Sequence, residues 1–437
     1  MTPLGNSLIK EGYMKDKKTT KRLSRRTFLK GCGAGTLGLA TTSLGFPNII
    51  LGKAPEEVLI GCVNPLSGPA SRLGWYATNG IQLAVEDINN AGGIKSLGGA
   101  KLKLLTGDCV MDPSKGMSET EKMIKAGVSV MFGCFVSSIT IAATQVAEKY
   151  QVPFIVDISV GDMITERGFK YTFRTNIKTE VLALQYLELV DLLSKTTNIP
   201  IRTGVFLHES GLYGQSYKQS FMKHTGKAGV FKIIEHIAYP TQTKDMTSEV
   251  LKAKALKPDI ILSINYVPDA ILMMRTLYEQ KVDCLGVVSP ASSGIDDPSF
   301  GKSLGRISDY VMVSTPAVNW KNPKTVDMLD RYVKRFNEPW HSANVLSYDG
   351  MLVAADALER AASTDPKKVR DAIAQTNLSD YRMYGRGPIK FDEHGDNLNG
   401  LLSMTQWMNG KQQYALPLDF AQAKFVFSVP KWSERKM

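Results

Sequence analysis

The sequence predicts an α/β protein of two lobes, each built on a doubly wound parallel sheet. Short apolar runs alternate with segments of helical periodicity, which is the pattern of right-handed βαβ units. The alternation pauses at 171–180 and then begins again, which indicates a second, independent lobe. About 380 residues follow a basic N-terminal segment, more than one ordinary domain holds.

The first lobe is predicted from its opening strand and helix. Residues 58–63 form a continuous apolar run, as expected of a strand buried on both faces. Apolar side chains then recur at i, i+3, i+4 and i+7 from Ile81, and this helix ends at Gly92-Gly93. The same reasoning predicts strands at 101–106, 128–133 and 152–156 and helices at 113–126 and 138–150.

The second lobe repeats this architecture without a visible repeat of sequence. Its predicted strands are 202–208, 230–239, 258–264 and 284–289, and its predicted helices are 213–225, 245–256 and 269–280. Further helices are expected at 325–336, 347–362 and 366–375, followed by a hairpin-like tail at 387–407.

The first 54 residues have the features of an export signal. In "SRRTFLKGCGAG", Arg25 and Arg26 precede Phe-Leu-Lys, and a mild apolar stretch follows. A charged region followed by a short apolar region is a signal segment rather than a membrane span. The segment resembles the twin-arginine export signal, with a small-x-small cleavage step at Gly52-Lys53-Ala54. We therefore expect residues 1–54 to direct the folded protein through the twin-arginine translocase to the periplasm.

The charge of the chain is concentrated in this leader. Of the 53 basic and 42 acidic residues, the leader holds ten and two, so the formal net charge falls from +11 to about +3 without it. Nucleic-acid binding therefore loses its main compositional support, and no nucleic acid is expected as a partner.

Motifs for cofactors and catalysis are missing from the sequence. After the leader, Cys62, Cys109, Cys134 and Cys284 lack CxxC spacing, and no GxGxxG follows the first strand. HExxH is also absent, and no Ser lies in the strand-to-helix elbow that a catalytic GxSxG requires. We expect a protein without a cofactor or metal that catalyses no reaction.

Candidate ligand residues lie in the loops after the predicted strands, because open α/β sheets bind ligands at the carboxyl ends of their strands. The loop after the first strand offers Leu73 and Trp75 as apolar walls. The loop after the third strand places Ser137 and Ser138 at a helix start, where free amides and the helix dipole attract a carboxylate.

Two further sets of loops complete the candidate site. Asp157, Ser159 and Asp162 follow the fourth strand, and their oxygens can hydrogen-bond a ligand. Tyr213 and Tyr266 follow strands of the second lobe, where they can stack on a ligand and hydrogen-bond it. Capping of turns by the polar residues and core packing of the tyrosines remain the alternatives.

A series of short motifs connects the chain to a known family. An S-G-P follows the first strand, and "GWYATNGIQLAVEDINNAGGI" spans the helix after it. "FGCFVSSIT", "TERGFKYTFRT", "YGQSYKQSF" and "GPIKFDEHGD" follow in order. Together they cover nearly the whole chain after Pro55 and resemble the leucine/isoleucine/valine-binding protein family, the type I periplasmic solute-binding proteins of ABC importers.

This resemblance implies two lobes joined by a hinge of three crossovers. Lobe 1 would comprise 55–177 and 317–401, and lobe 2 would comprise 178–316 and 402–437. The cleft would close on one small solute and deliver it to an ABC importer permease, and we expect a monomer.

The resemblance also implies positions for the solute. Its carboxylate would lie at the Ser137–Ser138 turn and at the turn near Ser159 and Val160. The contacts from the second lobe would fall near Tyr213 and Tyr266.

The sequence departs from the family where the amino-acid binders hold the ammonium group. They use an acidic residue after a "G-P", and the matching position here is Ala291. A buried ammonium without a charged partner is costly. Either Asp157, Asp162 or Asp269 substitutes, or the solute is a carboxylate, aromatic acid or amide without an α-ammonium, which is the outcome we predict.

The family's amino-acid members also have a disulfide in the first lobe, at positions that match Met111 and Val136. Cys109 and Cys134 each lie two residues earlier, which keeps their side chains on the same strand faces. A bridge between them and a pair of buried thiols both remain open.

Two other functions share the same sequence features. An exported receptor would present its ligand to a sensor domain, and neighbouring permease and ATPase genes would distinguish it from a transport protein. An exported enzyme would turn over its ligand.

The Arg25–Arg26 pair is predicted to be necessary for export. Replacing both with Lys keeps the charge and removes the guanidinium pair of the motif, so precursor should accumulate in the cytoplasm. Cell fractionation measures this, and normal periplasmic accumulation of the double variant would contradict the prediction.

Overall fold

The computed structural model describes residues 55–227 and 230–435. The predicted export segment, with Arg25, Arg26 and the proposed cleavage step, lies outside the described residues. Within them, no helix has both the length and the apolar character needed to cross a membrane.

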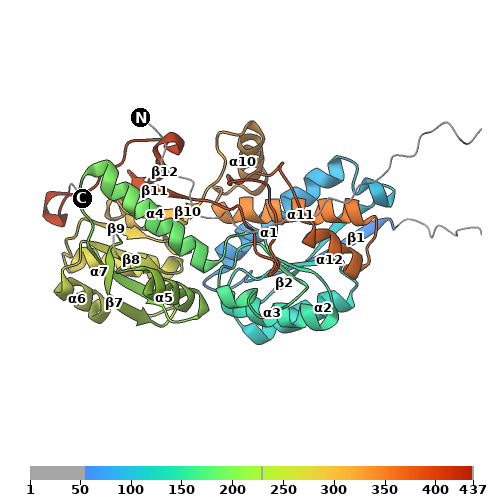
Figure 1. Cartoon of the computed structure of the whole chain (residues 1–437), viewed down its shortest axis with the longest axis horizontal. Coiled ribbons are helices and arrows are strands. Elements are labelled where there is room, and N and C mark those ends of the chain that lie inside the picture. Colours follow the sequence, from blue (N-terminus) through green and yellow to red (C-terminus); the bar gives the residue numbers. More distant parts are fainter. Residues whose placement is uncertain (1–54, 228–229, 436–437) are drawn as a thin grey trace, which may run out of the picture. The chain divides into compact units, whose positions relative to one another are not determined.

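The first sheet has five parallel strands in the order β2-β1-β3-β4-β5 (Figure 1). Because β1 lies between β2 and β3, the winding direction reverses there, and a crevice is expected at the carboxyl ends of these strands. The strands are β1 (Glu57–Asn64), β2 (Lys101–Asp108), β3 (Val130–Gly133), β4 (Phe154–Val156) and β5 (Thr172–Arg174). The helices among them are α1 (Ser71–Asn90), η1 (Lys95–Leu97), α2 (Pro113–Lys125), α3 (Ser137–Tyr150) and η2 (Asp162–Ile164).

The second sheet has seven strands in the order β12-β11-β10-β9-β8-β6-β7. Its parallel part, β6 to β10, repeats the strand order of the first sheet, and β11 and β12 add an antiparallel hairpin beside β10. The strands are β6 (Thr203–Glu209), β7 (Lys232–Tyr239), β8 (Ile260–Ile264), β9 (Gly286–Ser289), β10 (Met312–Pro316), β11 (Leu402–Met408) and β12 (Lys411–Leu416). The helices are α4 (Thr179–Thr197), α5 (Leu212–His224), α6 (Thr247–Leu256), α7 (Val267–Glu279), α8 (Ser293–Asp296), α9 (Pro298–Leu304), η3 (Gly305–Ser308), η4 (Leu418–Phe420) and η5 (Trp432–Glu434).

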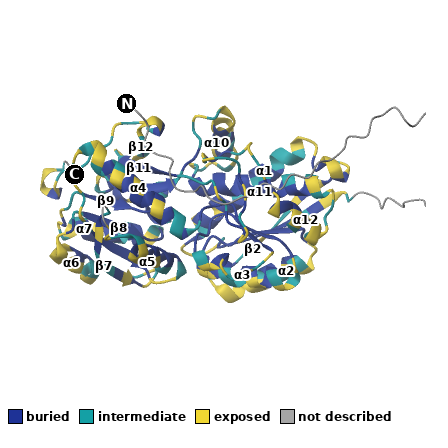
Figure 2. Cartoon of the chain, in the orientation of Figure 1, coloured by how far each residue is buried: buried dark blue, intermediate teal, exposed yellow. Residues whose placement is uncertain are grey.

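Three helices follow β10 and precede β11 in the sequence. They are α10 (Pro323–Phe336), α11 (Ser342–Ala361) and α12 (Pro366–Ala374). Helix α11 packs along α1 of the first sheet, so the chain passes between the sheets after β5, after β10 and before β11. Buried residues follow the strands, while the helices expose their outer faces (Figure 2).

Several elements were not predicted. Strand β5 has only three residues, too few to show a period, and β10, α8 and α9 are also short. Helix α4 had a signal, since buried Leu182, Tyr186, Leu189 and Leu193 recur at helical spacing.

The tail hairpin lies further along the chain than predicted. Residues 387–400 form only isolated bridges, and the hairpin consists of β11 and β12. Its turn is Asn409-Gly410, with both residues at positive φ. This dipeptide is a strong hairpin signal, because both residues tolerate the left-handed conformation.

Gly80 sets the close approach of α1 to α11. A Cβ built at this position would lie 2.2 Å from the carbonyl oxygen of Asn344 in α11, so the helices cannot keep their spacing with any other residue. Gly80→Ala should lower the free energy of unfolding by about 1–3 kcal/mol through overpacking.

Gly350→Ala is the matched control, because it lies in α11 and its added Cβ would meet side-chain atoms rather than backbone, the nearest in Phe132 at 3.2 Å. Urea unfolding followed by circular dichroism measures both variants. Equal losses of stability would contradict the role assigned to Gly80.

Candidate functional site

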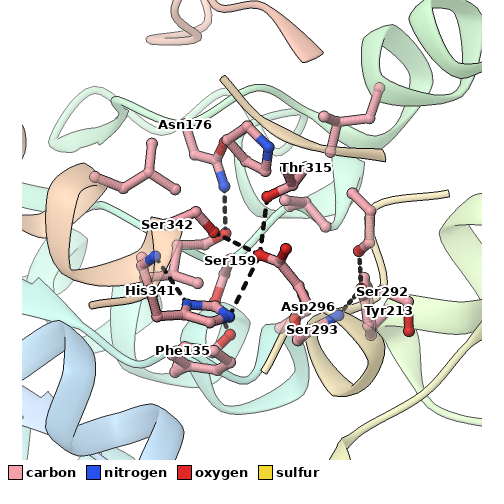
Figure 3. Close-up of a pocket in the computed structure, with 18 of the residues that line it drawn as sticks. Phe135, Ser159, Asn176, Tyr213, Ser292, Ser293, Asp296, Thr315, His341 and Ser342 are labelled. Carbon is pink, nitrogen blue, oxygen red and sulfur yellow. Dashed lines mark hydrogen bonds and ion pairs between the residues drawn. The ribbon is translucent and has the colours of Figure 1, made fainter. Parts of the chain in front are cut away.

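A pocket lies where the loops after the strands of both sheets meet (Figure 3). The first sheet contributes Ser137 after β3 and Ser159 after β4, and the second contributes Tyr213, Tyr266 and Ala291 after β6, β8 and β9. Its cavity volume is about 50 Å³, space for a few water-sized groups. The pocket therefore suits a small molecule held between the sheets.

Helix α3 begins at the pocket. The amides of Ile139 and Thr140 donate to the carbonyl of Val136, so the amides of Ser137 and Ser138 precede the first hydrogen bonds of the helix. The Ser137 side chain is buried, and its Oγ accepts a long contact of 3.4 Å from the amide of Gly161. This helix start can donate hydrogen bonds to an anionic oxygen.

The loop after β4 is held in place by hydrogen bonds within the protein. Ser159 Oγ donates to the Phe135 carbonyl at 2.8 Å and lies 2.6 Å from Thr140 Oγ1. The guanidinium of buried Arg174 donates to the carbonyl of Val160 at 2.6 Å. These contacts set the shape of the pocket, and they already engage the hydroxyl of Ser159.

Two tyrosines form the wall on the side of the second sheet. The rings of Tyr213 and Tyr266 lie 5.9 Å apart at 46°, and the Tyr213 hydroxyl donates to the carbonyl of Ala291. Burial raises the pKa of both phenols well above their usual value, so both are neutral. Within the described residues the Tyr266 hydroxyl has no hydrogen-bond partner, so it is available to a ligand.

Asp296 forms the third wall. Its Oδ2 accepts from Thr315 Oγ1 at 2.8 Å and from Ser342 Oγ at 2.9 Å, and its Oδ1 accepts from Gln412 at 2.7 Å. Figure 3 shows how Thr315, Ser342 and His341 converge on this carboxylate.

The roles of the two ring nitrogens of His341 follow from its position as the cap of α11. The amide of Ala343 donates to His341 Nδ1 at 3.0 Å, so the ring proton is on Nε2. Nε2 lies 3.4 Å from Asp296 Oδ2 and is buried without a hydrogen-bond partner in the described structure. It is an unused donor at the pocket.

Of the residues predicted from sequence, six line this pocket and four do not. Those lining it are Ser137, Ser159, Val160, Tyr213, Tyr266 and Ala291.

The other four lie elsewhere. Leu73 is in the core, and Trp75 is exposed and donates from its indole to the Leu66 carbonyl. The side chain of Ser138 is exposed. Asp157 is fully buried and accepts from Ser347 Oγ, and burial raises its pKa to about 6.

The acids considered as ammonium partners also lie away from the pocket. Asp162 accepts from the amide of Glu180, and Asp269 accepts from the amide of Gln242. Burial raises the pKa of each to about 6. The acid that does line the pocket is Asp296, which sequence reasoning missed although it lies five residues after Ala291.

His341, Ser342 and Thr315 were also missed. Helix α11 was predicted to begin at Ser347, whereas it begins at Ser342 with His341 as its cap. Thr315 lies in the unpredicted strand β10. A better prediction of these two elements would have drawn attention to all three residues.

The cysteines of the described chain are free thiols. Cys109 and Cys134 are buried and unbridged, so the structure favours the second of the two alternatives. No group of three His, Cys, Asp or Glu side chains that could hold a metal ion was found in residues 55–227 and 230–435.

Known proteins resemble this chain along most of its length. A Leu/Ile/Val-binding protein homolog from Brucella suis is 27% identical over 405 residues, which cover 90% of this chain and 97% of that protein. The substrate-binding protein LivJ from Streptococcus pneumoniae, solved with isoleucine, is 21% identical with a TM-score of 0.70 over 85% of this chain and 99% of that one. A solute-binding protein of an ABC transporter from Rhodopseudomonas palustris, solved with 3,4-dihydroxybenzoic acid, is 21% identical with a TM-score of 0.69 over 86% and 99%.

These structures share the fold of two α/β lobes. The family model described as periplasmic binding protein matches residues 57–412, which include the first sheet, the second sheet as far as the start of β12, and the pocket. The chain belongs to the periplasmic binding protein family.

Proposed function

We propose that this protein captures a small organic solute outside the cytoplasm and delivers it to the permease of an ABC importer. The observation that carries the proposal is the pocket itself, whose walls come from the carboxyl ends of both sheets and hold unused polar donors on each side. The relatives described as ABC transporter substrate-binding proteins support the same function.

The proposed mechanism is closure of two lobes about a hinge. Lobe 1 comprises 55–177 and 317–401, lobe 2 comprises 178–316 and 402–437, and the three passages between the sheets form the hinge. A solute that contacts both walls binds the closed form more tightly than the open form, and this difference drives closure without covalent chemistry. We also propose that the protein is a monomer and not an enzyme. In this proposal it is exported by the twin-arginine route to the periplasm.

The start of α3 is the proposed site for a solute carboxylate. The unused amides of Ser137 and Ser138 and the positive end of the helix dipole favour negative charge there. No Lys or Arg among the described residues lines the pocket, so this helix start is its main anion-binding feature.

Asp296 changes the expectation for the rest of the solute. Asp296 is the acidic residue among the described side chains that line the pocket. A second negative charge in the same pocket would be repelled, since two like charges about 4 Å apart cost roughly 4 kcal/mol at an effective dielectric of about 20. A zwitterion avoids this cost, because its ammonium end can face Asp296 while its carboxylate faces α3.

We therefore favour a small α-amino acid over the solute without an α-ammonium that the sequence indicated. The prediction from sequence rested on Ala291, and the same pocket is also lined by an acid, Asp296. The apolar part of the solute would lie against Tyr213, Tyr266 and Leu346.

A thermal-shift panel tests the ligand class, since binding to the native state raises the melting temperature by mass action. L-Leucine, L-isoleucine and L-valine should stabilise the protein more than their deaminated acids, and more than benzoate. Asp296→Asn should remove this preference.

Asp269→Asn is the matched control, because it removes a buried carboxylate outside the pocket. A deaminated acid that stabilises as strongly as its amino acid, in a protein insensitive to Asp296→Asn, would restore the solute without an ammonium.

Ser137 and Ser138 provide a second, paired test. Ser137→Ala removes a buried hydroxyl at the pocket and should weaken L-leucine binding by about 1–3 kcal/mol. Ser138→Ala removes an exposed hydroxyl from the same turn and should leave binding unchanged. Isothermal calorimetry measures both, and unchanged affinity of Ser137→Ala would reassign Ser137 to a structural role.

A further inference from the structure

Two adjacent acidic residues in the helical segment after β9 face residues of helices that pack on the first sheet. Asp296 and Asp297 lie at the junction of α8 and α9, which follow β9. Asp296 contacts His341 and Ser342 at the start of α11. Asp297 faces Arg72 in the first turn of α1.

Asp297 has one oxygen engaged and one without a hydrogen bond. Its Oδ1 caps α9 by accepting from the amide of Ser299 at 2.7 Å. Its Oδ2 is buried without a hydrogen-bond partner and forms an ion pair with Arg72 Nε at 3.6 Å. The side chain of Asp297 is fully buried, so its charge needs this cation.

Arg72 connects that acid to the wall of the pocket. Its Nε also donates to the Tyr76 hydroxyl at 2.8 Å, and its guanidinium lies 5.5 Å from the Tyr76 ring. The Tyr76 ring stacks on His341 at 5.1 Å and 7°. Arg72 itself does not line the pocket, so it can act on the solute only through its neighbours.

We infer that Arg72 and Asp297 form a latch, made when the lobes close, that holds the protein shut over its solute. The inference rests on the proposed function for the closing motion. When the lobes part, water can reach Asp297, and when they close, Arg72 replaces that water. The latch therefore stabilises the closed form and slows release of the solute. Arg72 is a positioning residue, because it acts on the pocket through Tyr76 and His341.

Three variants separate the latch from a general loss of structure. Arg72→Gln removes the cation, and Asp297→Asn removes the charge while keeping an oxygen to cap α9. In the double variant the buried unpaired charge is gone, so its loss of affinity should be smaller than the sum of the two single losses.

The control is Arg306→Gln. Arg306 Nε and Asp309 Oδ2 lie 3.4 Å apart, with 51% and 5% of their side chains exposed, against 42% and 0% for Arg72 and Asp297. Arg306 lies in η3 and Asp309 directly follows η3, so the pair does not join the two sheets.

Stopped-flow fluorescence with L-leucine measures release and capture separately. Arg72→Gln should speed dissociation about 3- to 10-fold and leave association nearly unchanged, and high salt should reduce the difference from the unaltered protein. Equal dissociation rates of Arg72→Gln and Arg306→Gln would overturn the latch.

A readout without solute keeps the latch separate from the choice of ligand. By small-angle scattering in low salt, Arg72→Gln should have a larger radius of gyration than the unaltered protein, and Arg306→Gln should not. If L-leucine binds neither the unaltered protein nor the variants, the proposed solute is wrong. The comparison of the radii of gyration then tests the latch by itself. Equal radii for the unaltered protein and Arg72→Gln would overturn it.

Discussion

The burial of Arg174 is the constraint on which the pocket depends. Its side chain has no contact with water, and its guanidinium donates to the carbonyls of Val160 and Gly161 in the loop that lines the pocket. Its Nε lies 3.1 Å from Asp396, a residue more than 200 positions later in the chain. Burial lowers the pKa of Arg174 and raises that of Asp396, so loss of hydration outweighs the attraction between them. Such a pair is costly to separate, and it therefore ties the end of the first sheet to the third passage between the sheets.

The polar groups of the pocket are largely used by the protein itself. Ser159, Tyr213 and Asp296 each have internal partners, which hold their side chains in place before any solute arrives. Among the described residues the unused groups are fewer: the start of α3, the Tyr266 hydroxyl, Ser314 Oγ and His341 Nε2. A site with most of its polar atoms preorganised loses little conformational entropy when a ligand binds, and its few free atoms then determine the specificity.

Asp296 and Asp297 show how neighbours in sequence can have different roles. Three hydrogen bonds stabilise the Asp296 carboxylate at the pocket wall. Asp297 caps α9 and faces a half-exposed arginine on α1. In the proposed function one acid selects the charge of the solute, and in the proposed latch the other stabilises closure of the lobes.

The sequence by itself determined the alternation of strands and helices, the division into two α/β units and the loops in which ligand residues should be sought. These depend on hydrophobic periodicity and turn residues, which are local properties of the chain. It could not determine which side chains in those loops face the pocket: Ser137 is buried there while Ser138 is exposed, and Asp157 turns toward Ser347. Asp296, Thr315 and His341 come together from three distant segments, and only the tertiary structure decided that contact. The physical reason is that side-chain direction and charge pairing depend on packing partners far along the chain, which no local pattern specifies.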